Sequence, residues 1–270
     1  MEKFAVIIVA AGKSQRFLKG NTGLDHSFLQ KKPFALLKGR AVWLHSVQKF
    51  SNRREVKQII LVAAPDDKKG IEQKYAADLS FLGIDLVEGG SERFQSVENG
   101  LKILHEDIDY VAVHDAVRPC ISDGLIESVF DSARKYGAAI PAAPIHGTIK
   151  RAIITGEKEQ KSELERVQEK LKSPPSEKKI RMIKETVPRE DLWEAQTPQV
   201  FRKDLILRAY RERTCSFPTD DAQLLEDLGI KAAIVPSNSM NIKITTAQDL
   251  LCAEKFLDLT GRKTGMGFFS

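Results

Sequence analysis

Phe4-Ala-Val-Ile-Ile-Val-Ala-Ala-Gly-Lys-Ser-Gln-Arg16 decides the fold, because an apolar run leads directly into a turn of small and basic residues. The run is far shorter than the roughly 18 apolar residues of a membrane span. The turn stands where a signal-peptide cleavage site would be expected, so we interpret the run as a buried strand and not as an export signal. Similar β-branched runs recur at residues 58–62, 84–87, 110–113 and 138–140.

Segments with helical spacing of apolar residues separate these runs, at residues 42–50, 97–104 and 125–133. Strands that are apolar almost throughout, alternating with amphipathic helices, are typical of a parallel sheet covered on both faces. We therefore expect an α/β fold with a doubly wound, mostly parallel sheet and right-handed crossovers. The pattern resumes later in the chain, with helices expected at 203–211, 220–228 and 247–259 and a strand at 232–235.

Residues 150–189 interrupt this alternation. We find no β-branched pattern at 150–187, and the charged run 157–172 holds only a narrow helical stripe of Leu164, Val167 and Leu171. Residues 151–189 contain 11 Lys and Arg against 7 Asp and Glu, so they supply four of the five net positive charges of the chain. About 40 residues cannot bury a core of their own. We predict one domain over 1–270 with an arm inserted at 150–189.

Composition narrows the class of protein. The chain has 270 residues, of which 42% are hydrophobic and 29% charged, as in ordinary globular proteins. Its three cysteines form no CxxC pair, which disfavours a disulfide framework or a zinc site and fits the cytoplasm. The arm has no aromatic residue on which bases of a single strand could stack. We therefore expect neither a nucleic-acid partner nor a membrane.

Ligands of such sheets bind beyond the carboxyl ends of the strands, so the loops there are the candidates for function. In the loop 10–16, small residues let the backbone N–H groups approach an anion, and Lys13 and Arg16 add charge. This loop matches neither GxGxxG nor GxxxxGK[ST]. The segment 88–100 opens with a glycine pair, Ser91 is a possible helix N-cap, and the Ser96 hydroxyl suits the polar edge of a base.

Two later segments carry isolated charges. Asp115 ends a central strand, and burial there requires a cation, either Arg118 or a divalent metal with a ligand hydroxyl. We interpret the neighbouring His114 as a neutral histidine bonded in the core. Residues 219–222 are interpreted as a helix N-cap with acidic residues in the first turn. Lys243, between two isoleucines, is expected to face an anionic group.

Seven motifs in one order carry a resemblance that covers nearly the full chain. They are AAGKSQR (10–16), GGSERFQSVENGL (89–101), VHDAVRP (113–119), TIK (148–150), LWEAQTPQ (192–199), TDDA (219–222) and NIKIT (241–245). This pattern resembles the family of 2-C-methyl-D-erythritol 4-phosphate cytidylyltransferases. The resemblance implies a Rossmann-like nucleotidyltransferase that joins CTP to a polyol phosphate in isoprenoid precursor synthesis and releases pyrophosphate. It also implies Mg²⁺ as cofactor and a homodimer formed through the arm.

The resemblance assigns roles to individual residues. Catalytic roles would belong to Arg16, Lys32 and Lys243. The nucleotide would contact Ala10, Ala11, Gly12, Gly90, Ser96 and Asp115. The acceptor polyol phosphate would contact Asp115, Arg118, Thr148, Arg189 and Thr197, with Arg189 supplied across the dimer. Asp115 would also help to place the metal.

Three departures from the family pattern leave alternatives open. Fifteen residues (17–31) separate Arg16 from Lys32, and the adjacent Lys31 is a second candidate for the active lysine. Gly147 stands where the family has an aspartate, so ribitol 5-phosphate is an alternative acceptor. The arm is also longer than is usual in the family. An alternative of another class is a non-catalytic protein whose basic arm binds RNA or another protein.

Overall fold

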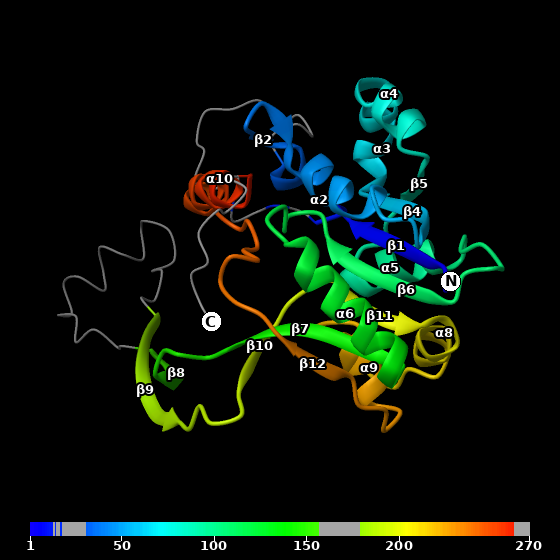
Figure 1. The fold of residues 1–270 in the computed structure, drawn as a ribbon. Helices are drawn as coiled ribbons and strands as arrows, with labels where there is room; N and C mark the ends of the chain where they lie inside the picture. Colours follow the sequence, from blue (N-terminus) through cyan, green and yellow to red (C-terminus); the bar gives the residue numbers. More distant parts are fainter. Residues whose placement is uncertain (13, 15–16, 18–30, 157–178, 262–270) are drawn as a thin grey trace, which may run out of the picture. The chain divides into compact units, whose positions relative to one another are not determined.

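The computed structural model describes residues 1–12, 14, 17, 31–156 and 179–261 (Figure 1). The chain divides into two compact units. The larger unit comprises residues 1–143 and 194–270, and the smaller unit comprises residues 144–193. No helix in the described ranges combines the length and the apolar character that crossing a membrane requires.

An eight-stranded sheet organises the larger unit, with strand order β10-β7-β11-β6-β1-β4-β5 and β12 paired to β7. The strands are β1 (Phe4–Val9), β4 (Val56–Ala63), β5 (Ile84–Glu88), β6 (Tyr110–Asp115), β7 (Ala138–Pro144), β10 (Trp193–Ala195), β11 (Gln199–Arg202) and β12 (Ala233–Pro236). β1 is parallel to both β4 and β6, with Val9 opposite Val62 and Asp115. β11 runs antiparallel between β6 and β7. The mostly parallel sheet predicted from the sequence is confirmed, whereas β11 was not predicted.

Helices cover both faces of this sheet (Figure 1). They are α2 (Val42–Ser51), α3 (Pro65–Lys74), α4 (Ala76–Phe81), α5 (Arg93–Leu101), α6 (Asp123–Tyr136), α8 (Lys203–Arg211), α9 (Ala222–Glu226) and α10 (Ala247–Gly261). A 3-10 turn, η2 (Lys32–Phe34), and two short strands, β2 (Leu36–Leu37) and β3 (Arg40–Ala41), connect β1 to α2.

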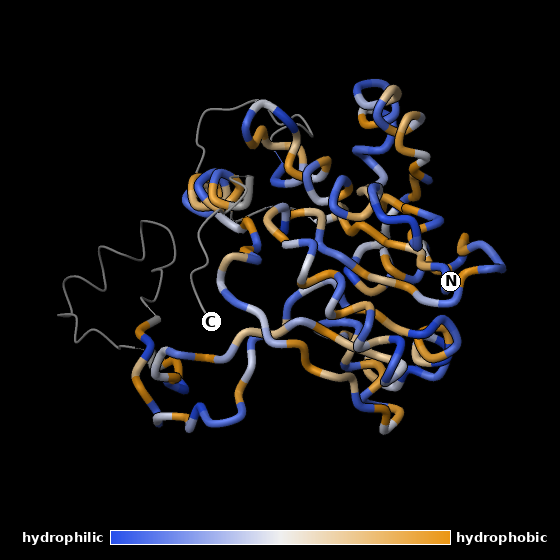
Figure 2. Tube along the Cα trace, in the orientation of Figure 1, coloured by the Kyte–Doolittle hydropathy of each residue, from blue (hydrophilic) through white to orange (hydrophobic). Residues whose placement is uncertain are grey.

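The side chains of β1 alternate between two apolar layers, as a strand buried on both faces requires. Phe4 and Ile8 pack with residues of α2 and α6, such as Trp43. Ile7 packs in the opposite layer with residues of α5, α8 and α9, such as Val97. Figure 2 shows hydrophobic residues along these central strands. The doubly wound arrangement follows from this alternation.

Local signals set the ends of the helices that reach the sheet. Ser122 accepts a hydrogen bond from the Leu125 N–H at 3.2 Å and caps the start of α6. Gly137 ends α6 in the left-handed region, at φ +82°, where glycine is favoured. In α5, a Cβ on Gly100 would lie 3.0 Å from Ile7, so glycine there permits close packing of helix on strand.

The smaller unit contains a two-stranded antiparallel sheet of β8 (Ile149–Gly156) and β9 (Lys179–Val187). The sequence interpretation that residues 150–187 lack strand character is therefore wrong at both ends of that segment. A register shift between Arg151 and Ala152 breaks the two-residue alternation, which explains why no strand pattern is evident in the sequence. The predicted helical stripe at 164–171 lies outside the described residues.

Candidate active site

A cavity of about 530 Å³ opens at the carboxyl ends of the central strands in the larger unit. Its walls come from the loop after β1, η2, the start of α5, the end of β6 and the segment before α10. All six residues predicted to contact a nucleotide line it, namely Ala10, Ala11, Gly12, Gly90, Ser96 and Asp115. Lys32 and Lys243 line it as well. Arg16 and Lys13 lie outside the described residues.

Hydrogen bonds join the described residues of the loop after β1 to β4 and to η2. The Ala10 N–H donates to the Val62 carbonyl at 2.8 Å, continuing the strand pairing. Ser14 has φ +53°, and its hydroxyl accepts from the Lys32 N–H at 3.1 Å. A Cβ on Gly12 would meet no atom within 4 Å, so the backbone there faces open space. The loop therefore presents backbone to the cavity and holds Lys32 beside it.

The glycine pair before α5 packs tightly against this loop. A Cβ on Gly89 would lie 2.6 Å from the Ala11 Cβ and 2.7 Å from the Ser96 hydroxyl. That hydroxyl accepts from the Gly90 N–H at 3.1 Å and donates to the Glu92 carbonyl at 3.2 Å. The prediction that Ser91 caps the helix is wrong. The helix begins at Arg93, so Glu92 occupies the N-cap position and forms a capping box with Gln95, and the Ser91 hydroxyl donates to Gln95 Oε1 at 2.7 Å.

The two adjacent lysines at the start of η2 have different environments. The Lys31 ammonium lies 2.8 Å and 2.7 Å from the two carboxylate oxygens of Asp67 in α3. Asp67 is only 3% exposed, so this ion pair satisfies a buried charge. Lys32 instead lines the cavity. The geometry thus favours Lys32 over Lys31 as the lysine that meets a ligand.

Among the residues that the structure describes, three cations surround the Asp115 carboxylate at the end of β6. The Lys243 ammonium is 2.8 Å from Oδ2, Arg118 Nε is 3.5 Å from Oδ2, and Arg93 Nε is 3.7 Å from Oδ1. Burial opposes ionisation of Asp115, but Lys243, Arg93 and Arg118 outweigh it and hold its pKa well below the ordinary value. The sequence indicated that Asp115 needs a cation and named Arg118. The sequence alone does not predict that Arg93 or Lys243 is a partner of the Asp115 carboxylate.

His114 faces the core beside this group. Its Nδ1 lies 3.2 Å from the Thr197 hydroxyl, and its Nε2 lies 3.2 Å from the Arg118 carbonyl. Burial lowers the pKa of His114 to about 4. The interpretation of His114 as a neutral core histidine agrees with these contacts. The Thr197 hydroxyl also accepts from the Asp115 N–H at 3.0 Å, so it fixes the backbone from which the carboxylate projects.

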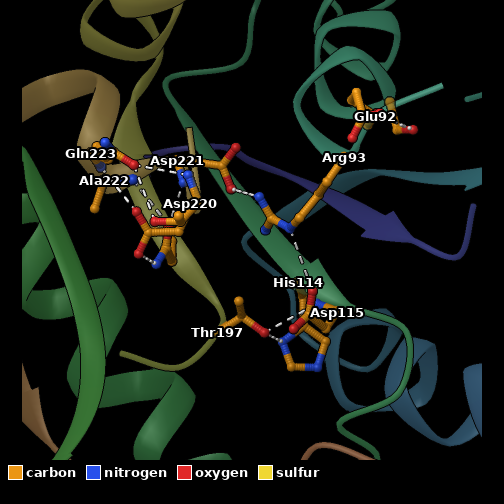
Figure 3. Close-up of polar contacts among 12 residues, drawn as sticks. Glu92, Arg93, His114, Asp115, Thr197, Asp220, Asp221, Ala222 and Gln223 are labelled. Atoms are coloured by element: carbon orange, nitrogen blue, oxygen red, sulfur yellow. Dashed lines mark hydrogen bonds and ion pairs between the residues drawn. The ribbon is translucent and has the colours of Figure 1, made fainter. Parts of the chain in front are cut away.

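A second buried carboxylate holds the far side of Arg93 (Figure 3). Asp221 accepts from Arg93 Nη1 at 2.8 Å and from the Tyr210 hydroxyl at 2.6 Å. The capping interpretation of residues 219–222 holds for Asp220, which accepts from the Gln223 N–H at 3.0 Å. It is wrong for Asp221, whose side chain turns inward to Arg93. The signal in the sequence for this role of Asp221 is the pair of adjacent acidic residues before an apolar helix. Only one of the two side chains can cap the helix, so the other is available for a different partner.

The residues predicted to bind an acceptor are divided between the two units. Arg118 is buried, and its Nη1 donates to the Asn241 carbonyl at 2.7 Å. It lies in the larger unit with Asp115 and Thr197. Thr148 and Arg189 belong to the smaller unit, where Arg189 Nη1 donates to the His146 carbonyl. The geometry of the larger unit therefore brings together three of the five predicted acceptor residues.

The described residues contain no cluster of three or more His, Cys, Asp or Glu side chains that could hold a metal ion by themselves. Mg²⁺ is commonly held by one or two carboxylates together with substrate phosphates. Asp115 is a carboxylate on the cavity wall and fits that pattern.

Comparison with known proteins places this geometry in a family. Residues 4–259 match the family model described as IspD, 2-C-methyl-D-erythritol 4-phosphate cytidylyltransferase. A relative of that name from Solibacter usitatus (strain Ellin6076) is 35% identical over 257 residues, covering 94% of this chain and 96% of its own. Another, from Endomicrobium trichonymphae, is 36% identical over 255 residues and covers 94% of this chain and 99% of its own.

Solved structures give the same result. The 4-diphosphocytidyl-2C-methyl-D-erythritol synthase from Anaerococcus prevotii superposes with a TM-score of 0.69 at 29% identity, covering 95% of this chain and 96% of its own. The 2-C-methyl-D-erythritol 4-phosphate cytidylyltransferase from Thermus thermophilus has a TM-score of 0.66 at 28% identity, covering 96% of this chain and 100% of its own.

Proposed function

The chain belongs to the family of 2-C-methyl-D-erythritol 4-phosphate cytidylyltransferases, and we propose that the cavity in its larger unit is the active site. The protein is a nucleotidyltransferase that joins CTP to 2-C-methyl-D-erythritol 4-phosphate, giving the CDP-alcohol and pyrophosphate in isoprenoid precursor synthesis. The observation that carries the assignment to this cavity is the convergence of Lys32, Lys243 and Asp115 with two backbone loops. We propose the cytoplasm as the compartment.

The reaction needs little covalent chemistry from the protein. A phosphate oxygen of the acceptor attacks the α-phosphorus of CTP and forms a new P–O bond, while the bond to the β-phosphate oxygen breaks and pyrophosphate leaves with the electron pair. The attacking oxygen is already ionised near neutral pH. No general base is therefore required, which agrees with the hydrogen-bonded, buried state of His114.

Electrostatic repulsion is the main barrier, because the two reactants together carry roughly six to seven negative charges. Preorganised cations and N–H groups stabilise the charge that spreads over the transition state. We propose that Lys32, Lys243 and Arg16 contact the triphosphate at its reacting end. The backbone of residues 10–12 and 90, with the Ser96 hydroxyl, would hold the nucleoside.

Mg²⁺ is the proposed cofactor. Asp115 would hold it together with phosphate oxygens, and the ion would neutralise phosphate charge when bound. Asp115 would also orient the substrate. Arg118 would fix the position of the Asp115 carboxylate, and Thr197 would fix the Asp115 backbone. Thr148 and Arg189 are proposed acceptor contacts.

We also propose a homodimer formed through the smaller unit. In its two-stranded sheet Ile153 and Met182 face each other, and both are about half exposed. Ile154 and Ile183 are exposed as well. Exposed apolar patches of this kind commonly mark protein interfaces. The double variant Ile154→Glu, Ile183→Glu should become monomeric in light scattering, whereas a wild-type monomer would contradict the proposal.

Pyrophosphate release tests the function. The assay compares CTP with ATP, GTP and UTP, and compares 2-C-methyl-D-erythritol 4-phosphate with ribitol 5-phosphate and with no acceptor. We expect release only with CTP and fastest with the methylerythritol substrate. Faster release with ribitol 5-phosphate would reassign the acceptor, which is the question that Gly147 raises. Release with no pair of substrates, together with salt-dependent RNA binding, would support the non-catalytic alternative.

A further inference from the structure

Arg93 stands in an unusual position for a cation. It is the first residue of α5, where the helix dipole favours negative charge, and its side chain is only 27% exposed. Burying a cation at that end of a helix is costly unless acidic groups compensate. Two carboxylates from remote elements do so, Asp115 at the end of β6 and Asp221 before α9.

Asp221 is held from three sides. It is 1% exposed, and its two carboxylate oxygens accept from Arg93 Nη1 and from the Tyr210 hydroxyl. Its backbone N–H donates to the Gln199 side chain at 3.0 Å. Because every partner is buried or partly buried, Asp221 is a fixed anchor for the Arg93 guanidinium (Figure 3).

The contacts of Asp115 with Arg93 and Lys243 differ in kind. Lys243 makes a direct 2.8 Å contact and is 41% exposed at the cavity wall. Arg93 Nε is 3.7 Å from the other carboxylate oxygen, beyond hydrogen-bond distance, but the guanidinium is fixed by Asp221. A Lys243 ammonium that contacts a phosphate of CTP shares its three N–H donors and its charge between that phosphate and Asp115. The fixed charge of Arg93 then remains beside that carboxylate.

We propose that Arg93 and Asp221 form a positioning pair, in which Asp221 holds the Arg93 guanidinium so that it keeps the Asp115 carboxylate in place when Lys243 engages the nucleotide. This inference rests on the proposed function of the cavity. Arg93 and Asp221 are positioning residues, since they act through Asp115. Tyr210 supports the pair from the core.

Steady-state kinetics of the full-length protein test the pair. Asp221→Asn keeps the shape of the side chain and removes its charge. We expect kcat to fall by about 10- to 100-fold, as when a positioned group shifts by about 1 Å, with a smaller change in KM for CTP. Arg93→Lys should give an intermediate loss, because an ammonium cannot bridge two carboxylates as a guanidinium does. Tyr210→Phe should lower kcat less, and it keeps the test valid if Asp221→Asn fails to fold.

Arg213→Gln is the matched control. Arg213 forms an ion pair at 3.2 Å with Glu98 of α5, the helix that carries Arg93, but it does not contact Asp115. The kcat of Arg213→Gln should equal that of the wild type. Pyrophosphate release by the wild type and by this control tests the proposed function separately from the positioning pair. A double-mutant cycle separates positioning from a structural role. In an Asp115→Asn background, Asp221→Asn should cause little further loss. Equal losses in both backgrounds, or wild-type kcat in Asp221→Asn and Arg93→Lys, would overturn the proposal.

Discussion

Substituting Lys31 and Lys32 one at a time should separate stability from turnover at two neighbouring positions. Lys31→Met leaves the buried Asp67 carboxylate without its ammonium partner. Removing one partner of a buried ion pair costs about 3–5 kcal/mol. We expect about 3 kcal/mol, at the lower end of that range, because the Lys31 side chain is 22% exposed and water can partly replace it. Adding Asp67→Asn should recover most of that loss, since the cost comes from the unpaired charge.

Lys32→Met should have the opposite profile. Its side chain lines an open cavity, so we expect a smaller change in the free energy of unfolding than for Lys31→Met. If Lys32 contacts the triphosphate in the transition state, kcat/KM should fall by about 100-fold or more, as when one preorganised donor is lost. Urea unfolding and pyrophosphate release measure the two quantities on the same preparations. A stable but inactive Lys31→Met protein beside an active Lys32→Met protein would refute the assignment.

Three further results are expected. Lys243→Ala and Arg16→Ala should each lower turnover by orders of magnitude in the pyrophosphate assay with the circular dichroism spectrum unchanged, and near wild-type turnover in both would remove these groups from transition-state stabilisation. Gly89→Ala should weaken CTP binding in calorimetry, because the new methyl group would lie 2.6 Å from Ala11 and push the loop after β1 outward, so unchanged affinity would count against that loop as a nucleotide contact. Burial lowers the pKa of His114 to about 4, so the unfolded chain gains a proton near pH 6.5 and the native protein does not. The free energy of unfolding should therefore fall as pH drops from about 6.5 to about 4, by about 3 kcal/mol in total, and this loss should be absent in His114→Gln when urea unfolding is compared at pH 7 and pH 5.

The sequence predicted the parallel part of the fold because its central strands β1, β4 and β6 are buried on both faces. Runs such as residues 4–9 and 58–62 are therefore apolar almost throughout and easily recognised. β11 was not predicted, because it has only four residues and follows directly after Thr197-Pro198. β8 and β9 were not predicted from the sequence. A register shift breaks their alternation, and their apolar side chains, such as Ile154 and Ile183, are exposed and do not form a buried face.

The candidate site was predictable where one loop acts alone and not where distant loops meet. Gly89, Gly90 and Ser96 lie close together in the sequence, in the turn before α5 and in its first turns, so local chemistry identified them. The partner of Asp221 was not predictable, because Arg93 precedes it by 128 residues and only the fold brings them within 2.8 Å. Lys31 and Lys32 could not be told apart in the sequence, since the difference lies in Asp67 of α3.

A crystal structure of the protein with CTP and Mg²⁺ tests the central claim most directly, because that claim is a convergence of charges on one triphosphate. We predict that the Lys243 ammonium lies within about 3 Å of an α-phosphate oxygen, with Arg16 and Lys32 on the same triphosphate and Arg93 still beside Asp115. A triphosphate bound elsewhere, with Lys243 remaining on Asp115 and Arg16 directed into another cavity, would contradict the account.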